Sequence, residues 1–468
     1  MLPPSGALSR VRANLVALKL VNQLDAENRY ATADEQALLA QWSGWGAAPE
    51  VFDPRKPRMA AERAELRDLL TDRQWAMARR NTLNAHYTDP AIASAMWGAL
   101  SRAGFSGGRV LEPGCGSGTF MASAPDSAQM VGVELDESTA RIAAALHPLA
   151  QIRAEGFQTT RVPEQTFAAV IGNVPFGDFR VIDRVHNQNQ HNIHNHFLIK
   201  SLALTSPGGY VAAVTSRWTM DGTDDRARRE MLQLGEFLGA VRLPSKAFQR
   251  VAGTDVVTDI VVFRRRDHDA VPNPIMEPHY ADFLHTTSAD VIDRSTGDRD
   301  KLTMSRYFDA HPNQMLGTPM VGQGIHGSRQ LVVSGATDST HIAEQVTTQL
   351  GVIVDAAVAR GQGLDAGWHN TTALAEVFDR GLQFSHQIES EHALGTLRLA
   401  PGTSIIERWN GKDWDEAKVK GARRQAEWGH LLTLRDIADK LVSAQRERRP
   451  EAERIGLRQQ LNEKYDEY

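Results

Sequence analysis

Three glycines, each two residues apart, form the segment with the clearest chemical signature in this sequence. Gly114, Gly116 and Gly118 follow a short apolar run that begins at Val110, and a helix-like stretch begins after them. Glycine takes positive φ angles and lets the backbone pass close to a ligand. The spacing indicates a nucleotide-type binding loop, but by itself it does not identify the ligand. No Lys-Ser or Lys-Thr pair follows the loop, which argues against a phosphate-cradling Walker loop.

Two acidic residues narrow the choice of ligand for this loop. Glu134 closes the next apolar run, 16 residues after Gly118, and Leu135 lies beside it. An acid at the end of a second strand can accept hydrogen bonds from both ribose hydroxyls of a nucleoside. Glu112 and Pro113 come directly before the first glycine. An acid at this place would repel a pyrophosphate, but it suits a cationic sulfonium. The residues therefore predict an S-adenosylmethionine site rather than an NAD site.

A third apolar run, residues 167–171, leads into Gly-Asn-Val-Pro-Phe-Gly-Asp at 172–178. This segment resembles the (Asp/Asn)-Pro-Pro-(Tyr/Phe) motif of methyltransferases that act on exocyclic or amide nitrogens. The N6 amine of adenine is a poor nucleophile because its lone pair is delocalised into the ring. Two fixed acceptors on its N–H bonds favour the geometry that can attack a methyl group.

The resemblance implies a role for each residue of the catalytic loop. The Asn173 side-chain oxygen and the Val174 carbonyl would accept from the amine, Pro175 would shape the loop, and Phe176 would stack on a flipped base. Val174 departs from the proline that is most frequent in that family. The change removes a fixed φ angle and adds an N–H group, which could loosen the loop.

Two flanking segments also resemble cofactor-binding motifs of these enzymes. Asn-Ala-His-Tyr-Thr-Asp-Pro, residues 84–90, resembles the Tyr-Thr-Pro motif, which implies a cofactor role for Tyr87 and contact of Thr88 with the methionine carboxylate. Thr88 or Asp89 can equally cap the helix that follows. Glu155 and Phe157 stand where the family often has a Gly-Asp-Phe segment in contact with the cofactor adenine.

The elements that would position these residues alternate between strand and helix from about 84 to 266. This alternation predicts an α/β fold with a parallel, doubly wound sheet, closed by an antiparallel pair of strands. Helices are predicted at 8–22, 33–42 and 60–80, irregular structure at 267–345, and helices again at 340–360 and 425–468. A small hairpin is predicted to turn at Asn410-Gly411. The expected domains are a helical region over 1–80, a catalytic domain over 81–268 and a mixed C-terminal region over 269–468, suited to binding DNA.

Longer stretches extend the resemblance over roughly residues 10–330. They are 41–46 (Gln-Trp-Ser-Gly-Trp-Gly), 82–88, 172–178, 215–221 (Thr-Ser-Arg-Trp-Thr-Met-Asp), 241–244, 247–248 and 253–259. Together they look like the adenine-specific DNA methyltransferase module of phage and plasmid methyltransferase-helicase proteins. The resemblance implies a class I, Rossmann-like catalytic core, double-stranded DNA as substrate, and a separate helicase or other partner protein. In that group the Asn-Val-Pro-Phe form is usual.

Composition narrows the class of protein further. The chain has 468 residues, 41% of them hydrophobic, and 52 basic against 57 acidic residues for a formal net charge of −5. It is therefore neither a disordered chain nor a globally basic nucleic-acid coat. Cys115 is the single cysteine, which excludes an intramolecular disulfide and fits a reducing compartment. No signal peptide or membrane span is apparent, so a cytoplasmic location is expected.

Three alternatives stay open at this point. The same motif activates amide nitrogens, so a protein-glutamine or RNA amine methyltransferase is one of them. A nucleic-acid-binding scaffold without turnover is another. The third is a metal site among the histidines of residues 186–196, which we do not expect, because no cysteine lies there and the nearby acids, Asp178 and Asp183, precede the histidines.

Overall fold

The computed structural model describes residues 3–46, 48–82, 88–248, 256–266, 278–323, 329–364, 397–401, 403–409, 413–417, 421–446 and 449–467. The chain divides into two compact units, Met1–Gly381 and Leu382–Tyr468. The expected boundaries at 80 and 268 fall within the first unit and stay predictions. None of the helices in the described ranges combines the length and the apolar composition that a membrane span needs.

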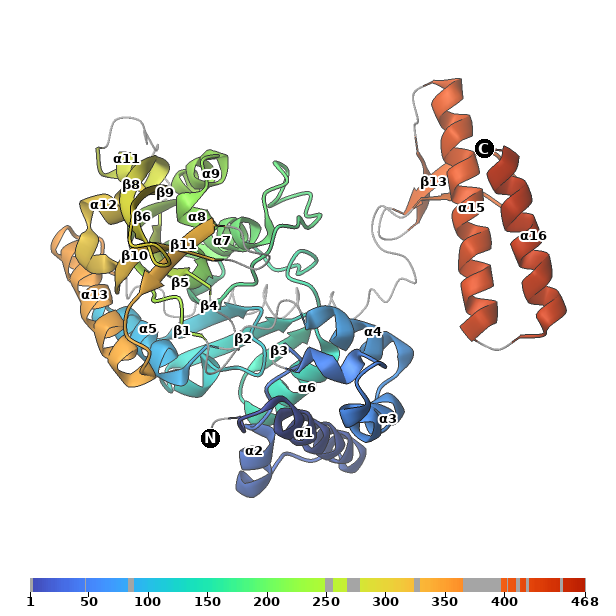
Figure 1. Ribbon diagram of the computed structural model, residues 1–468, viewed down its shortest axis with the longest axis horizontal. Coiled ribbons are helices and arrows are strands. Elements are labelled where there is room, and N and C mark those ends of the chain that lie inside the picture. The colour runs from blue at the N-terminus through green and yellow to red at the C-terminus, as the bar shows by residue number, and fades with distance from the viewer. Residues whose placement is uncertain are drawn as a thin grey trace. The chain divides into compact units, whose positions relative to one another are not determined.

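A helical layer begins the first unit. It consists of α1 (Ala7–Glu27), α2 (Ala33–Leu39), α3 (Ala60–Leu69) and α4 (Asp72–Asn81), with short 3-10 turns at Pro49–Phe52 and Pro57–Met59. The single helix predicted over 60–80 is in fact two helices, because Thr71 forms a capping box with Gln74 and starts a new one. The layer has its own apolar core, which includes Trp42 and Trp45. In Figure 1 α1 and α2 lie against α6 (Glu137–Leu146).

A seven-stranded sheet forms the centre of the first unit. Its strands are β1 (Gly108–Pro113), β2 (Ala128–Glu134), β3 (Gln151–Ala154), β4 (Phe167–Asn173), β5 (Thr205–Ser216), β6 (Gly235–Arg242) and β7 (Thr258–Arg265). They run in the order β3-β2-β1-β4-β5-β7-β6, and β7 is antiparallel to both of its neighbours. The predicted α/β fold and its closing antiparallel pair are thus confirmed.

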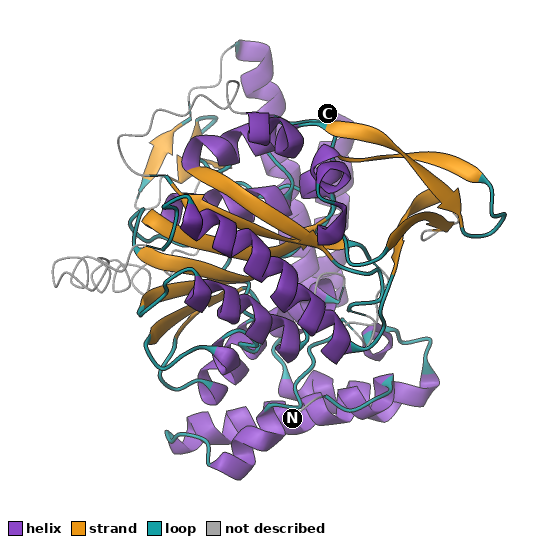
Figure 2. Ribbon diagram, turned by 90° about the vertical axis from the view of Figure 1, so that its left-hand side faces the viewer, coloured by secondary structure: helices purple, strands orange, loops and turns teal. Residues whose placement is uncertain are grey.

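Helices cover both faces of this sheet (Figure 2). On one face, α5 (Pro90–Arg102) and α13 (Ser339–Ala359) share an apolar cluster with strand residues such as Ile171, Ala212 and Val262. The helices α7 (Ile193–Leu204) and α9 (Arg226–Leu234) pack together, α7 against β5 and α9 against β6. The order reverses between β1 and β4, which is where doubly wound sheets bind their ligands.

The region after the sheet is more regular than expected. Residues 286–334 form a four-stranded sheet, β11-β10-β8-β9, from β8 (Thr286–Asp293), β9 (Arg299–Ser305), β10 (Thr318–Gln323) and β11 (Arg329–Ser334). The short helices α11 (Pro278–Leu284) and α12 (Arg306–Ala310) accompany it. The prediction of irregular structure here was wrong because much of β8 and β9 is exposed, so polar residues interrupt the apolar pattern.

The second unit is a small sheet with two helices. The strands β12 (Leu397–Leu399), β13 (Ile406–Trp409) and β14 (Trp414–Glu416) pair antiparallel, and α15 (Ala422–Arg446) packs against α16 (Glu451–Glu467). The predicted turn at Asn410-Gly411 lies outside the described residues. The mixed strand-and-helix character expected for the C-terminal region is confirmed.

Candidate active site

A cavity of about 400 Å³ opens where β3, β2, β1 and β4 end, at the point where the strand order reverses. Fifteen residues were expected at the site from the sequence, and the structure brings eleven of them to this one cavity. These eleven are Thr88, Glu112, Gly114, Gly116, Glu134, Leu135, Glu155, Phe157, Asn173, Val174 and Pro175.

The other four expected residues do not line the cavity in the described part of the chain. Pro113 is the last residue of β1, and Gly118 lies in the loop that follows it. Phe176 is partly exposed just beyond the lining residues, and Tyr87 lies outside the described residues. The roles of these four residues, like those of the eleven that line the cavity, stay predictions.

The glycine loop takes left-handed backbone conformations, which favour glycine. Gly114, Gly116 and Gly118 have φ angles of +68°, +56° and +85°. A Cβ atom built on Gly118 would lie 2.5 Å from the His147 ring. The loop therefore turns tightly, and Gly114 and Gly116 place no side chain in the cavity that they line.

Glu134 lies at the end of β2 and is bound to the glycine loop. Its carboxylate accepts hydrogen bonds from the Gly116 N–H at 2.9 Å and from the Asp136 N–H at 2.8 Å. Burial raises the pKa of Glu134 to about 7; the two N–H groups lower it, and the nearby Asp136 carboxylate raises it further. Each carboxylate oxygen keeps a second lone pair, which could accept from a ribose hydroxyl.

Glu112 is a second carboxyl group in the wall, and it is 2% exposed. Burial raises its pKa well above the usual range; N–H groups of Phe120 and Met121 oppose this, and the charge of Glu134 adds to it. Within the described residues its Oε2 atom is buried without a hydrogen-bond partner. A buried carboxyl group of this kind is stabilised by a cation nearby.

Cys115 lies between these acids but is not a candidate nucleophile. Burial, with the charges of Glu112 and Glu134, raises the pKa of its thiol well above the usual range. Its side chain belongs to the apolar core beneath the loop. The role of this side chain is therefore packing.

The charges around the cavity suit a ligand that is mainly cationic. Glu112, Glu134, Asp136 and Glu155 line it, and Arg80 is the one lysine or arginine among the described lining residues. Glu155 is neutralised by Arg153, whose Nε lies 2.6 Å from its Oε1 atom. Arg80 makes no ion pair in the described part of the chain. Among the described lining residues, carboxyl groups thus outnumber basic groups, and Arg80 is the basic side chain that no acid pairs with.

The predicted catalytic loop, residues 173–176, begins directly at the end of β4. Asn173 is its last residue and pairs in register with Val214 of β5, while the buried Val174 donates its N–H to the Val214 carbonyl at 3.0 Å. The N–H group that valine adds is thus used to continue the sheet. The concern that valine would loosen the loop is not supported.

Replacing Val174 with proline should therefore destabilise this protein, although proline is the commonest residue at that place in the methyltransferases whose motif it resembles. The substitution removes the donor to the buried Val214 carbonyl, a loss of about 1–3 kcal/mol. We expect the midpoint of thermal unfolding to fall by roughly 1–4 °C, because the unfolding entropy of a unit of this length is large. Calorimetry of Val174→Pro beside Val174→Ile, which keeps the N–H, checks this. An unchanged midpoint in the proline variant would contradict it.

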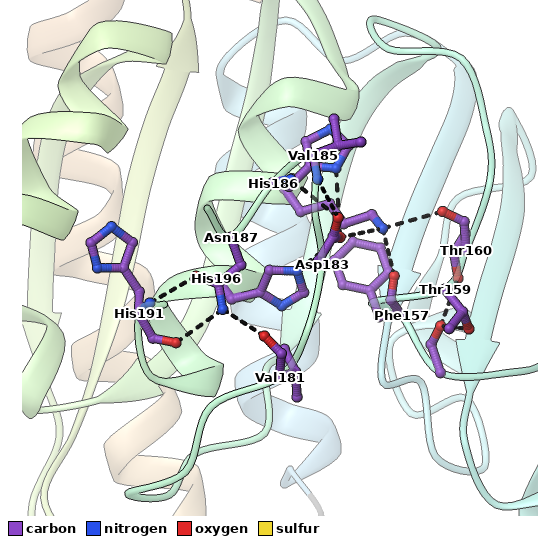
Figure 3. A network of polar contacts seen from close by, with 12 residues as sticks. Phe157, Thr159, Thr160, Val181, Asp183, Val185, His186, Asn187, His191 and His196 are labelled. Carbon is purple, nitrogen blue, oxygen red and sulfur yellow. Dashed lines mark hydrogen bonds and ion pairs between the residues drawn. The ribbon is translucent and has the colours of Figure 1, made fainter. Parts of the chain in front are cut away.

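The part of the cavity wall that contains Phe157 is held by a buried network around Asp183 (Figure 3). The Lys200 Nζ donates to the Asp183 Oδ2 at 2.9 Å and to the Phe157 carbonyl at 2.7 Å. His196 Nε2 lies 3.1 Å from the same carboxylate oxygen. Phe157 also packs on Phe197, with ring centroids 4.8 Å apart, and both rings line the cavity.

Several lining residues were missed from the sequence. Gly44, Trp45 and Arg80 belong to the N-terminal layer, which was not expected to contribute to the catalytic core. Phe179 and Val181 come from the segment after the catalytic loop. The available signal was weak: residues 41–46 matched the resembling family, but nothing indicated their role.

The open question of the helix cap is settled by geometry. Asp89 caps α5, its carboxylate accepting from the Ala91 N–H at 2.9 Å. Thr88 is buried and faces the cavity instead.

Histidines within residues 186–196 contact acidic side chains near this wall. His196 contacts Asp183, and His191 Nε2 lies 2.9 Å from Glu230. Burial lowers the pKa of His194 to about 4, with Asp178 opposing this. Across the described ranges, no cluster of three or more histidine, cysteine or acidic side chains has the geometry to hold a metal ion.

The similarity to known proteins concerns the fold. No protein-family model matches the chain, and no curated protein matches it. Similar solved structures include a protein of Listeria monocytogenes described as a class I S-adenosylmethionine-dependent methyltransferase (14% identity; 56% of this chain and 90% of that chain; TM-score 0.34). Another is the methyltransferase subunit of a type I restriction-modification system from Streptococcus thermophilus (14% identity; 75% of this chain and 79% of that chain; TM-score 0.37).

A third similar structure is a modification subunit of a type I restriction enzyme from Vibrio vulnificus (15%; 72% and 92%; TM-score 0.34). At these identities such likenesses say nothing about substrate. The strand order and the cavity at the switch point are those of the Rossmann-like α/β fold of class I methyltransferases.

Proposed function

We propose that this protein transfers the methyl group of S-adenosylmethionine to the N6 amine of adenine in DNA. The observation that carries the proposal is the meeting of two sets of residues in one cavity. The acids and the glycine loop at the ends of β1 and β2 adjoin Asn173 and Val174 at the end of β4. A cationic cofactor and an amine acceptor could therefore meet there.

The residues of the cavity fit the cofactor. The carboxyl groups of Glu112 and Glu134 suit a sulfonium and an ammonium group, and Glu134 would accept from ribose hydroxyls. Phe157 offers an apolar face to the adenine ring. Thr88 and Arg80 are the candidates for holding the methionine carboxylate.

In this proposal the chain acts by orientation. Bound S-adenosylmethionine supplies an electrophilic methyl group. The Asn173 side-chain oxygen and the Val174 carbonyl hold the two N6 hydrogens, so that the nitrogen lone pair faces the methyl carbon. Methyl transfer would form the N–C bond while the S–C bond breaks, and one N6 proton would pass to solvent. No covalent enzyme intermediate is needed.

The proposal is tested by mass spectrometry of nucleosides from duplex DNA incubated with the protein and S-adenosylmethionine. Appearance of N6-methyldeoxyadenosine supports the reaction. If no methylated nucleoside appears while calorimetry shows cofactor binding, the DNA proposal fails, and the same assay with RNA and with protein separates the remaining acceptors. Failure to bind the cofactor would favour a non-catalytic scaffold.

Cofactor affinity should depend on pH through Glu134. Its pKa of about 7 in the free protein means that it is largely protonated below neutral pH. Hydroxyl donors and a ligand cation favour the carboxylate, so binding should release a proton as the pKa falls. We expect affinity to rise about tenfold from pH 6 to pH 8.

Isothermal titration calorimetry in buffers of different ionisation enthalpy measures both the affinity and the proton release. S-adenosylhomocysteine lacks the sulfonium charge but keeps the ribose, so its affinity should also rise with pH. A constant affinity with no proton release across this range would contradict a role for Glu134.

Arg80 should decide whether the cofactor carboxylate is recognised. The protein should bind S-adenosylmethionine at least about tenfold more tightly than its decarboxylated analogue, because a guanidinium–carboxylate contact in this wall is lost. In Arg80→Gln the difference should shrink to about twofold. Arg79→Gln is the matched control, since Arg79 is an exposed neighbour on α4 that does not line the cavity. An equal loss of both ligands in Arg80→Gln would contradict the assignment.

A further inference from the structure

The segment after the catalytic loop presents apolar side chains to solvent beside the cavity. Phe179, Ile182 and Val185 are 39%, 87% and 52% exposed. Phe179 and Val181 also line the cavity, so Ile182 stands directly beyond its rim. Single exposed apolar residues are common on protein surfaces and need no explanation. The surroundings of Ile182 are what make it unusual.

The backbone on both sides of Ile182 is fixed by buried polar side chains (Figure 3). The Asn187 amide donates to the Val181 carbonyl at 2.9 Å. The Asp183 carboxylate accepts from the N–H groups of Val185 and His186 at 3.0 and 3.1 Å. The same carboxylate is bound to the ammonium group of Lys200. Ile182 is thus presented on a preorganised turn, so little conformational entropy is lost when it contacts a partner.

Two exposed arginines flank this side chain. Arg180 and Arg184 each lie two residues from Ile182, and neither makes an ion pair in the part of the chain that the structure describes. The Asp183 between them is buried and neutralised by Lys200. The exposed acid closest in sequence is Asp178, which accepts from the Asn192 amide at 3.3 Å. An apolar tip between two free guanidinium groups complements a nucleic-acid duplex, whose apolar base stack lies between charged phosphates.

We propose that Ile182 is a wedge that enters duplex DNA next to the target adenine and fills the space that the base leaves when it flips into the cavity. Arg180 and Arg184 would contact the phosphates on either side. The inference rests on the proposed function and adds the residue that separates the base from its stack. It predicts that Ile182 matters only when the target base must be unstacked.

The test compares three DNA substrates with the full-length protein. The first is an unmethylated duplex that contains the target adenine. The second is the same duplex with an abasic site opposite that adenine, and the third is the target strand alone. Ile182→Ala should slow single-turnover methylation of the intact duplex at least about tenfold, and change the rates on the other two by less than about twofold. Leu149→Ala is the matched control. Leu149 is 98% exposed, precedes the amino end of β3 and does not line the cavity, which lies at the carboxyl ends of the strands.

A second readout does not depend on turnover. With 2-aminopurine in place of the target adenine, wild-type protein should raise its fluorescence as the base leaves the stack, and Ile182→Ala should lose most of that rise. Wild-type behaviour of Ile182→Ala on the intact duplex, or equal losses on all three substrates, would overturn the inference. If the wild-type protein methylates none of the DNAs, the proposed function fails; the wedge then stands if Ile182→Ala loses a wild-type fluorescence rise, and falls if the two proteins do not differ.

Discussion

Replacing Asn173 with alanine is expected to slow methyl transfer to DNA by about 100- to 1,000-fold. The side chain stands at the end of β4 and lines the cavity, and its backbone is paired with β5. If its amide oxygen holds an N6 hydrogen, its loss leaves the amine free to rotate and its lone pair delocalised into the ring. The rate of the chemical step should fall, because the acceptor acts on the transition state more than on the bound ground state.

The contrast between two substitutions makes this result specific. Asn173→Asp keeps an acceptor oxygen of the same reach and should stay within about tenfold of the wild-type rate, whereas Asn173→Leu should behave like the alanine variant. Single-turnover rates at saturating cofactor measure the chemical step, and calorimetry measures cofactor affinity separately. A wild-type rate in Asn173→Ala would contradict the assigned role. A lost rate explained wholly by lost cofactor binding would place Asn173 in the cofactor site alone.

The parts of this site that the sequence could predict are those that follow strands. Glu112, Glu134 and Asn173 each lie within or at the end of an apolar run, and the runs are neighbours in the sheet. Carboxyl ends of parallel strands meet at one edge, so residues that are distant in the chain come together by a rule of the fold. The local sequence pattern, together with the topology of the fold, was therefore enough to predict eleven of the residues that line the cavity.

Other parts of the site depend on packing between elements, which no local pattern contains. Trp45 reaches the cavity because the N-terminal layer packs on α6, and Arg80 because it lies near the end of α4. The strand β3 was missed because it has four residues and lies at the edge of the sheet. Lys200 is the only lysine or arginine in α7, and its sequence neighbours give no sign of a partner. Its role appears only when α7 meets the loop that carries Asp183.

That buried pair leads to the second large effect. Asp183→Ala should lower the free energy of unfolding by about 3–5 kcal/mol, because it leaves the Lys200 ammonium group, 2% exposed, without its carboxylate. Lys200→Met should also be destabilising, because it leaves the buried Asp183 carboxylate without its ammonium partner. The double variant Asp183→Ala/Lys200→Met should be more stable than either single variant, since it buries no unpaired charge. Differential scanning calorimetry of the four proteins gives the comparison, and additive losses in the double variant would contradict the coupling.

The same pair should govern acid stability and cofactor binding together. Burial alone would raise the pKa of Asp183, but the neighbouring rings of His186 and His196 and the charge of Lys200 outweigh it and hold the pKa well below its usual value. A depressed pKa adds stability that is present above the unfolded value, about 4, and is lost as pH falls toward the folded value. Asp183→Asn should therefore flatten the loss of stability below pH 4. It should also weaken cofactor binding, because Lys200 joins Asp183 to the Phe157 carbonyl behind the cavity wall. A variant with altered acid stability but wild-type cofactor affinity would show that the network supports the fold without shaping the site.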